Sequence, residues 1–251
     1  PSGGAEPEPG IRIDGQYPFE EFERVTFPRA WKNAVQEIKT DAQGNQLSPE
    51  QTETEEFLTA DATDYTGVTV EPFTVCLDEG EHWLELVDPG QPIVIAEVAL
   101  AAPERADFYV TPEDIRTDVY EPIVIEGEDA AVKSNSAMAP KADNNDAGMS
   151  PADAYYTRIN YIGGTSWQSP RETLTWSFRV KTAGYYRLGF RYKQNTVING
   201  ESWRWLKIDG ETPFEEAKTL RFPYDPQWSF YEFRAEDGQP YYLWLDAGEH
   251  E

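Results

Sequence analysis

The sequence predicts an all-β protein built of β-sandwich modules, and three observations support this class. Proline and glycine are frequent, with 19 and 18 residues, and there are only 2 methionines. This composition is typical of short strands joined by many turns. Hydrophobic residues make up 39% of the chain and aromatic residues 14%, which is enough apolar mass for folded cores. Apolar and polar side chains also alternate in the second half of the chain, as strands with one buried face require.

The alternation is clearest in residues 176–192. Trp176, Phe178 and Val180 alternate with polar residues, and after the turn at 181–184 the apolar residues of 186–192 do the same. Period two on both sides of a short turn that contains glycine predicts an antiparallel hairpin. Residues 212–215 have the pattern of a capping box, so a single helical turn is expected there. Further strands are predicted at 123–125, 203–208 and 241–245.

An internal repeat organises the chain. Three short segments recur at an offset of 195 residues (208 − 13), and residues 77–82 recur as 245–250 at an offset of 168 (245 − 77). The first copy therefore carries 27 extra residues (195 − 168), which we place in the polar stretch 32–67, predicted to form a long loop. The three segments are Ile-Asp-Gly at 13–15 and 208–210, Pro-Phe-Glu-Glu at 18–21 and 213–216, and Phe-Pro at 27–28 and 222–223.

The repeat predicts two modules. Residues 1–102 are expected to form the C-terminal part of a first β-sandwich, 103–121 a linker rich in proline and charge, and 122–251 a second β-sandwich. By the offsets, the first copy lacks counterparts of residues 123–195, and the second lacks counterparts of residue 84 onward, including the strand-like 93–96. A half-sandwich exposes its inner face, so the first copy is expected to need further chain or an unusual pairing.

Charge and residue inventory exclude several functions. The formal net charge is −25, from 46 acidic and 21 basic residues, and such a chain repels nucleic acid and anionic lipid. No run of about 18 apolar residues occurs, so no membrane insertion by this segment is expected. The single cysteine, Cys76, excludes an internal disulfide framework.

The same inventory argues against an enzyme. The only histidines, His82 and His250, occupy the same repeated Gly-Glu-His turn, where a structural role is expected. Cys–His dyads and His-rich zinc sites therefore have no support. The adjacent acids at 20–21 and 215–216 cannot flank a glycosidic bond, and they suit the start of a helical turn.

Six short segments of the second copy occur in the order and spacing of a known family. They are Ile-Glu-Gly-Glu-Asp-Ala at 125–130, then 176–180, 183–186, 190–192, 206–210 and 245–250. On these segments the copy resembles the galactose-binding-like jelly rolls, which include many carbohydrate-binding modules. The resemblance implies a jelly-roll β-sandwich and a poly- or oligosaccharide as partner.

The tandem arrangement adds a second resemblance. The repeated Ile-Asp-Gly-x-x-Pro-Phe-Glu-Glu segments resemble paired modules of large extracellular solute-binding lipoproteins, which belong to the sugar-uptake transporters of gut Firmicutes. This resemblance implies an extracellular or cell-surface location and further domains in the parent chain. The fold alone does not specify a function.

Sugar binding requires an aromatic face for the C–H side of a pyranose and polar groups for its hydroxyls. The candidate ligand-binding residues lie in loops of the second copy or follow its strands, and the resemblance places a polar lip and a stacking aromatic there. They are Trp167, Gln194, Asn195, Tyr224 and Trp228. The alternative for each tryptophan is a role in the core or as a loop anchor.

Calcium is the expected cofactor. Glu126 and Glu128 are two apart in a predicted strand, so both are expected to project from one face. Paired carboxylates suit a hard cation, and the resemblance implies a structural calcium near this segment. The alternative is that these acids form a solvated edge.

Two functions remain open from the sequence. The first is non-catalytic glycan binding, and the second is a structural or protein-docking spacer without a ligand of its own. They differ in whether Trp167 and Trp228 share one exposed face or lie buried in the core.

Overall fold

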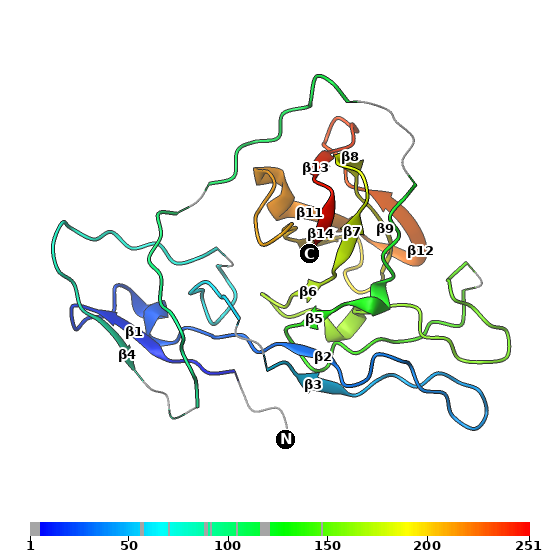
Figure 1. Cartoon of the computed structure of the whole chain (residues 1–251), viewed down its shortest axis with the longest axis horizontal. Coiled ribbons are helices and arrows are strands. Elements are labelled where there is room, and N and C mark those ends of the chain that lie inside the picture. The colour runs from blue at the N-terminus through cyan, green and yellow to red at the C-terminus, as the bar shows by residue number, and fades with distance from the viewer. Residues whose placement is uncertain are drawn as a thin grey trace.

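The computed structural model describes residues 6–55, 58–69, 71–87, 90, 92–103, 105–115, 121–146 and 148–251. These ranges contain strands and short 3-10 turns and no α-helix, so the predicted all-β class is confirmed (Figure 1). None of the helical turns described is long or apolar enough to cross a membrane. The strands are β1 (Gly10–Ile13), β2 (Trp31–Asn33), β3 (Gln51–Glu53), β4 (Leu84–Val87), β5 (Val132–Lys133), β6 (Leu174–Thr175), β7 (Phe178–Val180), β8 (Gly184–Arg187), β9 (Gly189–Gln194), β10 (Glu201–Arg204), β11 (Leu220–Pro223), β12 (Asp225–Glu232), β13 (Tyr242–Leu245) and β14 (Gly248–His250), and the turns are η1 (Glu20–Glu23), η2 (Gly127–Asp129), η3 (Gly164–Ser166) and η4 (Glu215–Thr219).

In the second half, β7, β8 and β9 pair antiparallel with β14, β13 and β12, and these three pairs, here called the ladder, replace the predicted hairpin. β7 pairs with β14, and β8 pairs with β13, so the expected pairing between 176–180 and 186–192 is wrong. Alternation identifies strands but not their partners. The partner strand β13 carries Leu243 and Leu245, which are both buried, and their burial favours this pairing.

The other predicted strands are found in part. Residues 241–245 contain β13, whereas only Trp203 and Arg204 of 203–208 belong to a strand, β10. Residues 123–125 form no strand, and Val124 is 74% exposed. A strand needs a neighbour for its backbone groups, and no neighbour lies beside this segment in the described part of the chain. The expected helical turn is present as η4, although no side chain caps it.

Strands from both halves share a four-stranded antiparallel sheet in the order β3-β2-β5-β6 (Figure 1). Its central rung pairs Trp31 with Lys133. The stretch 32–67, predicted as a long loop, therefore supplies β3 and most of β2. It also packs on the second half, since Gln46 N–H donates to the carbonyl of Thr157 over 3.0 Å.

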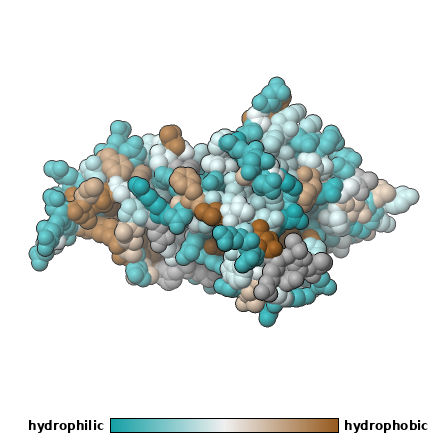
Figure 2. Space-filling view, turned by 90° about the horizontal axis from the view of Figure 1, so that it is seen from above, coloured by the Kyte–Doolittle hydropathy of each residue, from teal (hydrophilic) through white to brown (hydrophobic). Residues whose placement is uncertain are grey.

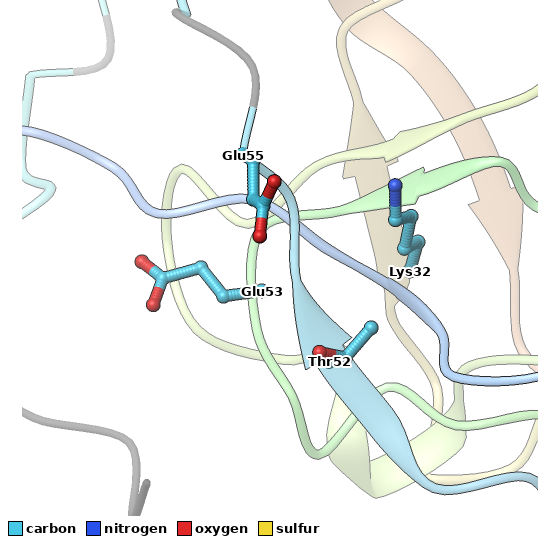
Figure 3. A pocket seen from close by; sticks show the side chains of 4 residues that line it. All are labelled: Lys32, Thr52, Glu53 and Glu55. Carbon is cyan, nitrogen blue, oxygen red and sulfur yellow. The ribbon is translucent and has the colours of Figure 1, made fainter.

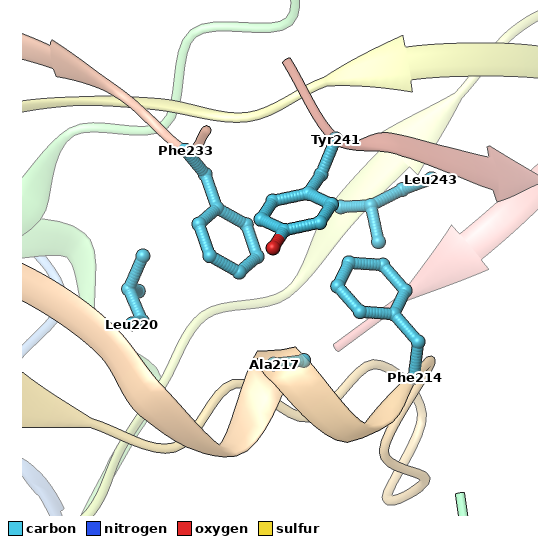
Figure 4. Packing of buried hydrophobic residues seen from close by; sticks show 6 residues of the cluster. All are labelled: Phe214, Ala217, Leu220, Phe233, Tyr241 and Leu243. Carbon is cyan, nitrogen blue, oxygen red and sulfur yellow. The ribbon is translucent and has the colours of Figure 1, made fainter. Parts of the chain in front are cut away.

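The main hydrophobic core lies under the ladder (Figure 4). Phe233 and Tyr241 pack at 4.5 Å between ring centroids, and Phe214 lies 4.9 Å from Tyr241. Tyr109, from the predicted linker, covers this core at 5.0 Å from Phe214. Burial of each such ring stabilises the fold by about 2–3 kcal/mol. The six buried residues are Phe214, Ala217, Leu220, Phe233, Tyr241 and Leu243.

A smaller core in the first half uses equivalent positions of the repeat. Its buried members include Phe22 and Val25, which correspond to Ala217 and Leu220 at the offset of 195 (217 − 22, 220 − 25). Phe73, packed against them, corresponds to Tyr241 at the offset of 168 (241 − 73). The repeated sequence thus produces the same local packing twice.

The two cores differ in how completely they are covered. Phe19 is 37% exposed, whereas its equivalent Phe214 is 6% exposed. Phe214 is enclosed by Tyr109 and Phe233 in addition to Tyr241. The second core is therefore the better sealed of the two.

Candidate functional site

Trp228 is half-buried on β12 and is held in place through its indole nitrogen. Its Nε1 donates a hydrogen bond to Asp143 Oδ2 over 2.9 Å. The ring of Tyr161 meets the indole edge-on, with 5.6 Å between centroids. Because the indole N–H is satisfied and one side is packed, the ring keeps a fixed orientation at the surface.

The carboxylate of Asp143 accepts several hydrogen bonds beside this ring. Lys193 Nζ lies 3.0 Å from Asp143 Oδ2, and the backbone N–H of Asn145 donates to Asp143 Oδ1 over 3.0 Å. The hydrogen bonds from Trp228 and Lys193 lower the pKa of Asp143 to about 2. Its carboxylate is therefore ionised throughout the neutral range and cannot serve there as a general acid.

The ammonium of Lys193 completes the cluster. Its Nζ lies 5.8 Å from the centroid of the Trp228 ring, within the range of a cation–π contact. Only one of its three N–H groups is needed for Asp143, so the others are able to meet a hydroxyl group. The arrangement combines an oriented aromatic ring with fixed donors and acceptors, as sugar recognition requires. We call Asp143, Tyr161, Lys193 and Trp228 the Trp228 cluster.

Buried Asn160 positions the loop that carries Asp143. Its side-chain oxygen accepts from the backbone N–H of Asp143 over 2.9 Å, and its Nδ2 donates to the carbonyl of Asp143 over 3.1 Å. Asn160 is 4% exposed, so these bonds are shielded from water. The carboxylate of Asp143 therefore sits on a rigid support.

Gln194, Asn195 and Tyr224 lie at the same end of the β9–β12 pair as Trp228, where Gln194 pairs with Asp225. Gln194 is 7% exposed, and its Oε1 accepts from the N–H groups of Thr196 and Val197 over 2.9 and 2.8 Å. Its amide thus holds the loop after β9. Asn195 is exposed, and Tyr224 is half-buried.

Trp167 is anchored in the turn that follows η3. Its Nε1 donates to the carbonyl of Glu172 over 2.9 Å, and the guanidinium of Arg204 lies 4.2 Å from its ring centroid. Arg204 Nη2 also donates to the carbonyl of Trp167 over 3.1 Å. Burial lowers the pKa of Arg204. One face of this indole is therefore occupied by Arg204.

Lys141 connects the turn of Trp167 with the Trp228 cluster. Lys141 pairs with Tyr161 in an isolated β-bridge, and Lys141 Nζ donates to Ser166 Oγ over 2.8 Å, next to Trp167. Asp143 follows two residues later and binds Trp228. Trp167 and Trp228 are both half-buried, and neither belongs to a buried core cluster.

Asp143 and Tyr161 were not among the predicted ligand-binding residues. Asp143 is 85 residues from Trp228 in the chain, and its hydrogen bond to the indole forms only on folding. No alternation or repeat in the sequence joins these positions. The one available signal was the polar loop at 143–146, which suits a tight turn as well as a site.

The predicted geometry of Glu126 and Glu128 is wrong. Glu126 is exposed and precedes the 3-10 turn η2, while Glu128 lies inside that turn and is 6% exposed. The two carboxylates therefore do not project from one strand face. Trp176 Nε1 donates to the carbonyl of Gly127 over 3.0 Å and draws the turn inward.

Glu128 is nevertheless unusual. Among the described residues, no group donates a hydrogen bond to its Oε2. Burial, with smaller contributions from the neighbouring Glu126 and Asp129, raises the pKa of Glu128 to about 7. No group of three or more His, Cys, Asp or Glu side chains suited to a metal is found in the described ranges. The turn thus offers one unpartnered carboxylate oxygen with two acids nearby.

A separate polar depression of about 500 Å³ lies beside β2 and β3 (Figure 3). It is lined by Lys32, Thr52, Glu53 and Glu55, and it includes none of the predicted site residues. Glu53 is engaged by Arg29, whose Nε donates to Glu53 Oε1 over 2.6 Å. Its four lining residues include no aromatic ring that could pack against a sugar.

Comparison with known protein families, with curated proteins and with solved structures finds no match for this chain.

Proposed function

We propose that the chain is a non-catalytic glycan-binding protein whose sugar stacks on Trp228. The observation that carries this proposal is the fixation of the Trp228 indole by Asp143 over 2.9 Å. A ring held at the surface loses little entropy when a pyranose packs against it. Lys193 and Asp143 provide charged partners for hydroxyl groups beside the ring.

The proposed binding surface includes the loop after β9. Asn195 is exposed there, and Gln194 stabilises the loop through its own amide. Tyr224 lies between β11 and β12, and its backbone N–H donates to the carbonyl of Gly200 over 2.9 Å. We assign Asn195 and Tyr224 to sugar contacts, Gln194 to positioning, and Trp167 to the border of the surface.

The fold proposed for this function is a tandem of galactose-binding-like jelly rolls in a secreted or surface-anchored sugar-capture protein. The internal repeat supports this fold, because equivalent positions of the two copies belong to the two core clusters. The parent protein would hold further domains and act in sugar uptake. The acidity of the chain, with a net charge of −25, suits a neutral or cationic ligand.

A structural calcium at η2 is a further part of the proposal. The unpartnered Oε2 of Glu128 fits a cation, which would keep the buried carboxylate ionised. Glu126 and backbone carbonyls of the turn would supply the remaining oxygens. Calcium there would stabilise the fold and take no part in chemistry.

The test is a glycan-array screen of the wild-type chain, with calcium and then with chelator, beside two tryptophan variants. Trp228→Ala should abolish binding. Trp203→Ala is the matched control, because Trp203 is 51% exposed on β10 and lies outside the Trp228 cluster. Equal loss in both variants, or no binding by a folded wild-type sample, would remove the proposal.

A structural or protein-docking spacer is the second candidate. Hydrophobic side chains gather at the end of the molecule that carries β1 and β4 (Figure 2), and exposed apolar residues of β4 include Leu84 and Leu86. Residues 93–96, expected to be strand-like, form no strand in the structure. Apolar surface of this kind is typical of contacts with other protein. A spacer would bind no glycan and would keep Trp228 only as a loop anchor.

A further inference from the structure

Trp244, on β13, is held in the same way as Trp228. Its Nε1 donates to Asp246 Oδ1 over 3.1 Å, and the ring of Tyr185 meets the indole edge-on, with 5.1 Å between centroids. The indole of Trp228 likewise donates to an aspartate and meets a tyrosine edge-on. Trp244 is 55% exposed, so a second oriented indole lies open at the surface.

The repeated turn does not require this indole. At the offset of 168, Asp246 has Asp78 as its counterpart in the first copy, whereas Trp244 has Cys76 (244 − 168 = 76). Both aspartates accept from a histidine of the turn through their backbone carbonyls, so the turn also forms with a small side chain in place of the indole. The exposed ring is therefore specific to the second copy.

Trp244 and Trp228 lie on the same outer face of the ladder. Side chains of the opposite, inner face belong to the main core or pack against it, and they are Leu188, Phe190, Tyr231, Phe233 and Leu243. Successive side chains of a strand point to opposite faces, so Trp228, Phe230 and Trp244 project outward. Lys193 of β9, 5.8 Å from the centroid of the Trp228 ring, lies on this face as well.

The outer face is continuous between the two tryptophans. The N–H of Phe233 donates to the carbonyl of Leu188 over 2.9 Å, which joins the β9–β12 pair to the β8–β13 pair. Across this junction, Arg187 Nη1 of β8 lies 3.1 Å from Glu232 Oε1 of β12. On β13, Trp244 lies two residues after the one opposite Arg187. The outward side chains between the two indoles therefore form one surface.

Phe230 lies between the two indoles on this surface. It is 73% exposed and lies opposite Arg191, whose exposed guanidinium presents N–H donors beside it. Its ring reaches across to Gly189 of β9, where a Cβ atom would lie 2.4 Å from Cζ of Phe230, so glycine leaves room for the ring. Phe230 with Arg191 thus repeats the combination of Trp228 with Lys193, an aromatic ring beside a cationic donor.

We propose that Trp244 is a second stacking site for the glycan and that the preferred ligand is an extended polysaccharide chain, which lies along the outer face from Trp228 past Phe230 to Trp244. This inference rests on the proposed function, since Trp228 remains the principal site. On the opposing strand, Lys193 beside Trp228 and Tyr185 opposite Trp244 are 8 residues apart (193 − 185), so the two indoles are separated by about 26 Å along the strand. A disaccharide is shorter than this distance. A polysaccharide reaches both rings, and it gains the second contact without a second loss of translational freedom.

The test is affinity electrophoresis of the whole chain in gels that each contain one soluble polysaccharide: xylan, mixed-linkage β-glucan, galactomannan or amylose. Trp244→Ala should weaken binding to the polymer that retards the wild-type chain by at least about tenfold. Trp244→Phe keeps a ring for stacking without the Nε1 hydrogen bond, and it should retain most of the affinity. Trp203→Ala is the matched control, because Trp203 is 51% exposed on β10, outside the ladder, and this variant should bind as the wild type does. The disaccharide unit of the same polymer, measured by titration calorimetry, should bind equally to the wild type and to Trp244→Ala, since Trp228 alone holds it.

Failure of this inference is distinguishable from failure of the proposed function. Unchanged polymer binding by Trp244→Ala, with binding lost in Trp228→Ala, leaves the site at Trp228 and removes the second one. Equal losses in Trp244→Ala and Trp244→Phe would assign Trp244 a structural role through Nε1 and would also overturn the inference. No retardation of a folded wild-type chain in any of the gels removes the proposed function and the second site together.

Discussion

His250 Nδ1 lies 2.7 Å from Asp209 Oδ2, and its other ring nitrogen lies 2.9 Å from the carbonyl oxygen of Asp246. Both partners are acceptors, so both ring nitrogens must carry a proton to satisfy them. His82 makes the same two contacts, with Asp14 and with the carbonyl of Asp78. When both ring nitrogens are protonated, each histidine therefore holds its copy of the repeated turn, a structural role.

Stability is expected to fall as pH rises through the pKa of these histidines. The contacts with the Asp246 carbonyl and with Asp209 raise the pKa of His250 above its ordinary value. A raised folded-state pKa gives stability that is complete below the unfolded pKa of about 6.5 and is lost as pH rises through the folded one. Urea unfolding between pH 5 and 9 measures this slope. His250→Gln should flatten it, and an unchanged slope in that variant would show that His250 does not cause it.

Lys133→Met is expected to stabilise the protein. Lys133 is 0% exposed, and its Nζ donates to the neutral Asn33 Oδ1 over 3.0 Å. Burial lowers the pKa of Lys133 to about 8, so near neutral pH the fold bears the cost of a buried charge. Methionine should raise the free energy of unfolding by about 1–3 kcal/mol at pH 7.

The pH dependence of that gain provides its control. A lysine with a lowered folded-state pKa binds fewer protons in the folded than in the unfolded protein between about pH 8 and 10.5, so wild-type stability rises with pH there. The advantage of Lys133→Met, measured by denaturant unfolding, should therefore shrink from pH 7 to pH 10. A constant advantage would indicate better packing and not the removal of a charge.

The better-sealed core should respond more strongly to truncation. Phe214→Ala is expected to cost about 3–5 kcal/mol, because it opens a cavity beside the buried rings of Phe233 and Tyr241. Phe19→Ala, at the equivalent position of the repeat, should cost clearly less, since Phe19 is 37% exposed. Thermal or urea unfolding of the two variants compares them. Equal losses would contradict the difference in coverage between the two cores.

Asp143→Asn is expected to loosen Trp228. The amide keeps the size of the side chain but removes the charge that meets Lys193 and Trp228, at a cost of about 1–3 kcal/mol. The pKa of Asp143 is lowered to about 2, so its contribution is complete above about pH 4 and is lost as pH falls toward 2. Trp fluorescence during acid titration follows this loss, and Trp228→Phe identifies the signal of Trp228. Identical acid transitions in wild type and Asp143→Asn would contradict the assignment.

Part of the candidate site could be predicted from local sequence. The family resemblance places Gln194 and Tyr224 in one site, and β9 and β12 do pair at that end. Asp143 and Tyr161 could not be placed, since their contacts with Trp228 join segments with no shared pattern. The orientation of Glu128 was also beyond the sequence, because a strand and a 3-10 turn share its residue types.

The sequence by itself determined the all-β class, the repeat and the structural use of both histidines. These features depend on alternation, glycine turns and side chains that bind nearby backbone, which are local properties of a chain. Only the tertiary structure decided that β7 pairs with β14, that the stretch 32–67 contributes to a sheet with β5, and that Asp143 holds Trp228. Such pairings depend on which apolar faces can be buried together. These faces come from segments far apart in the chain, so a local sequence pattern does not reveal them.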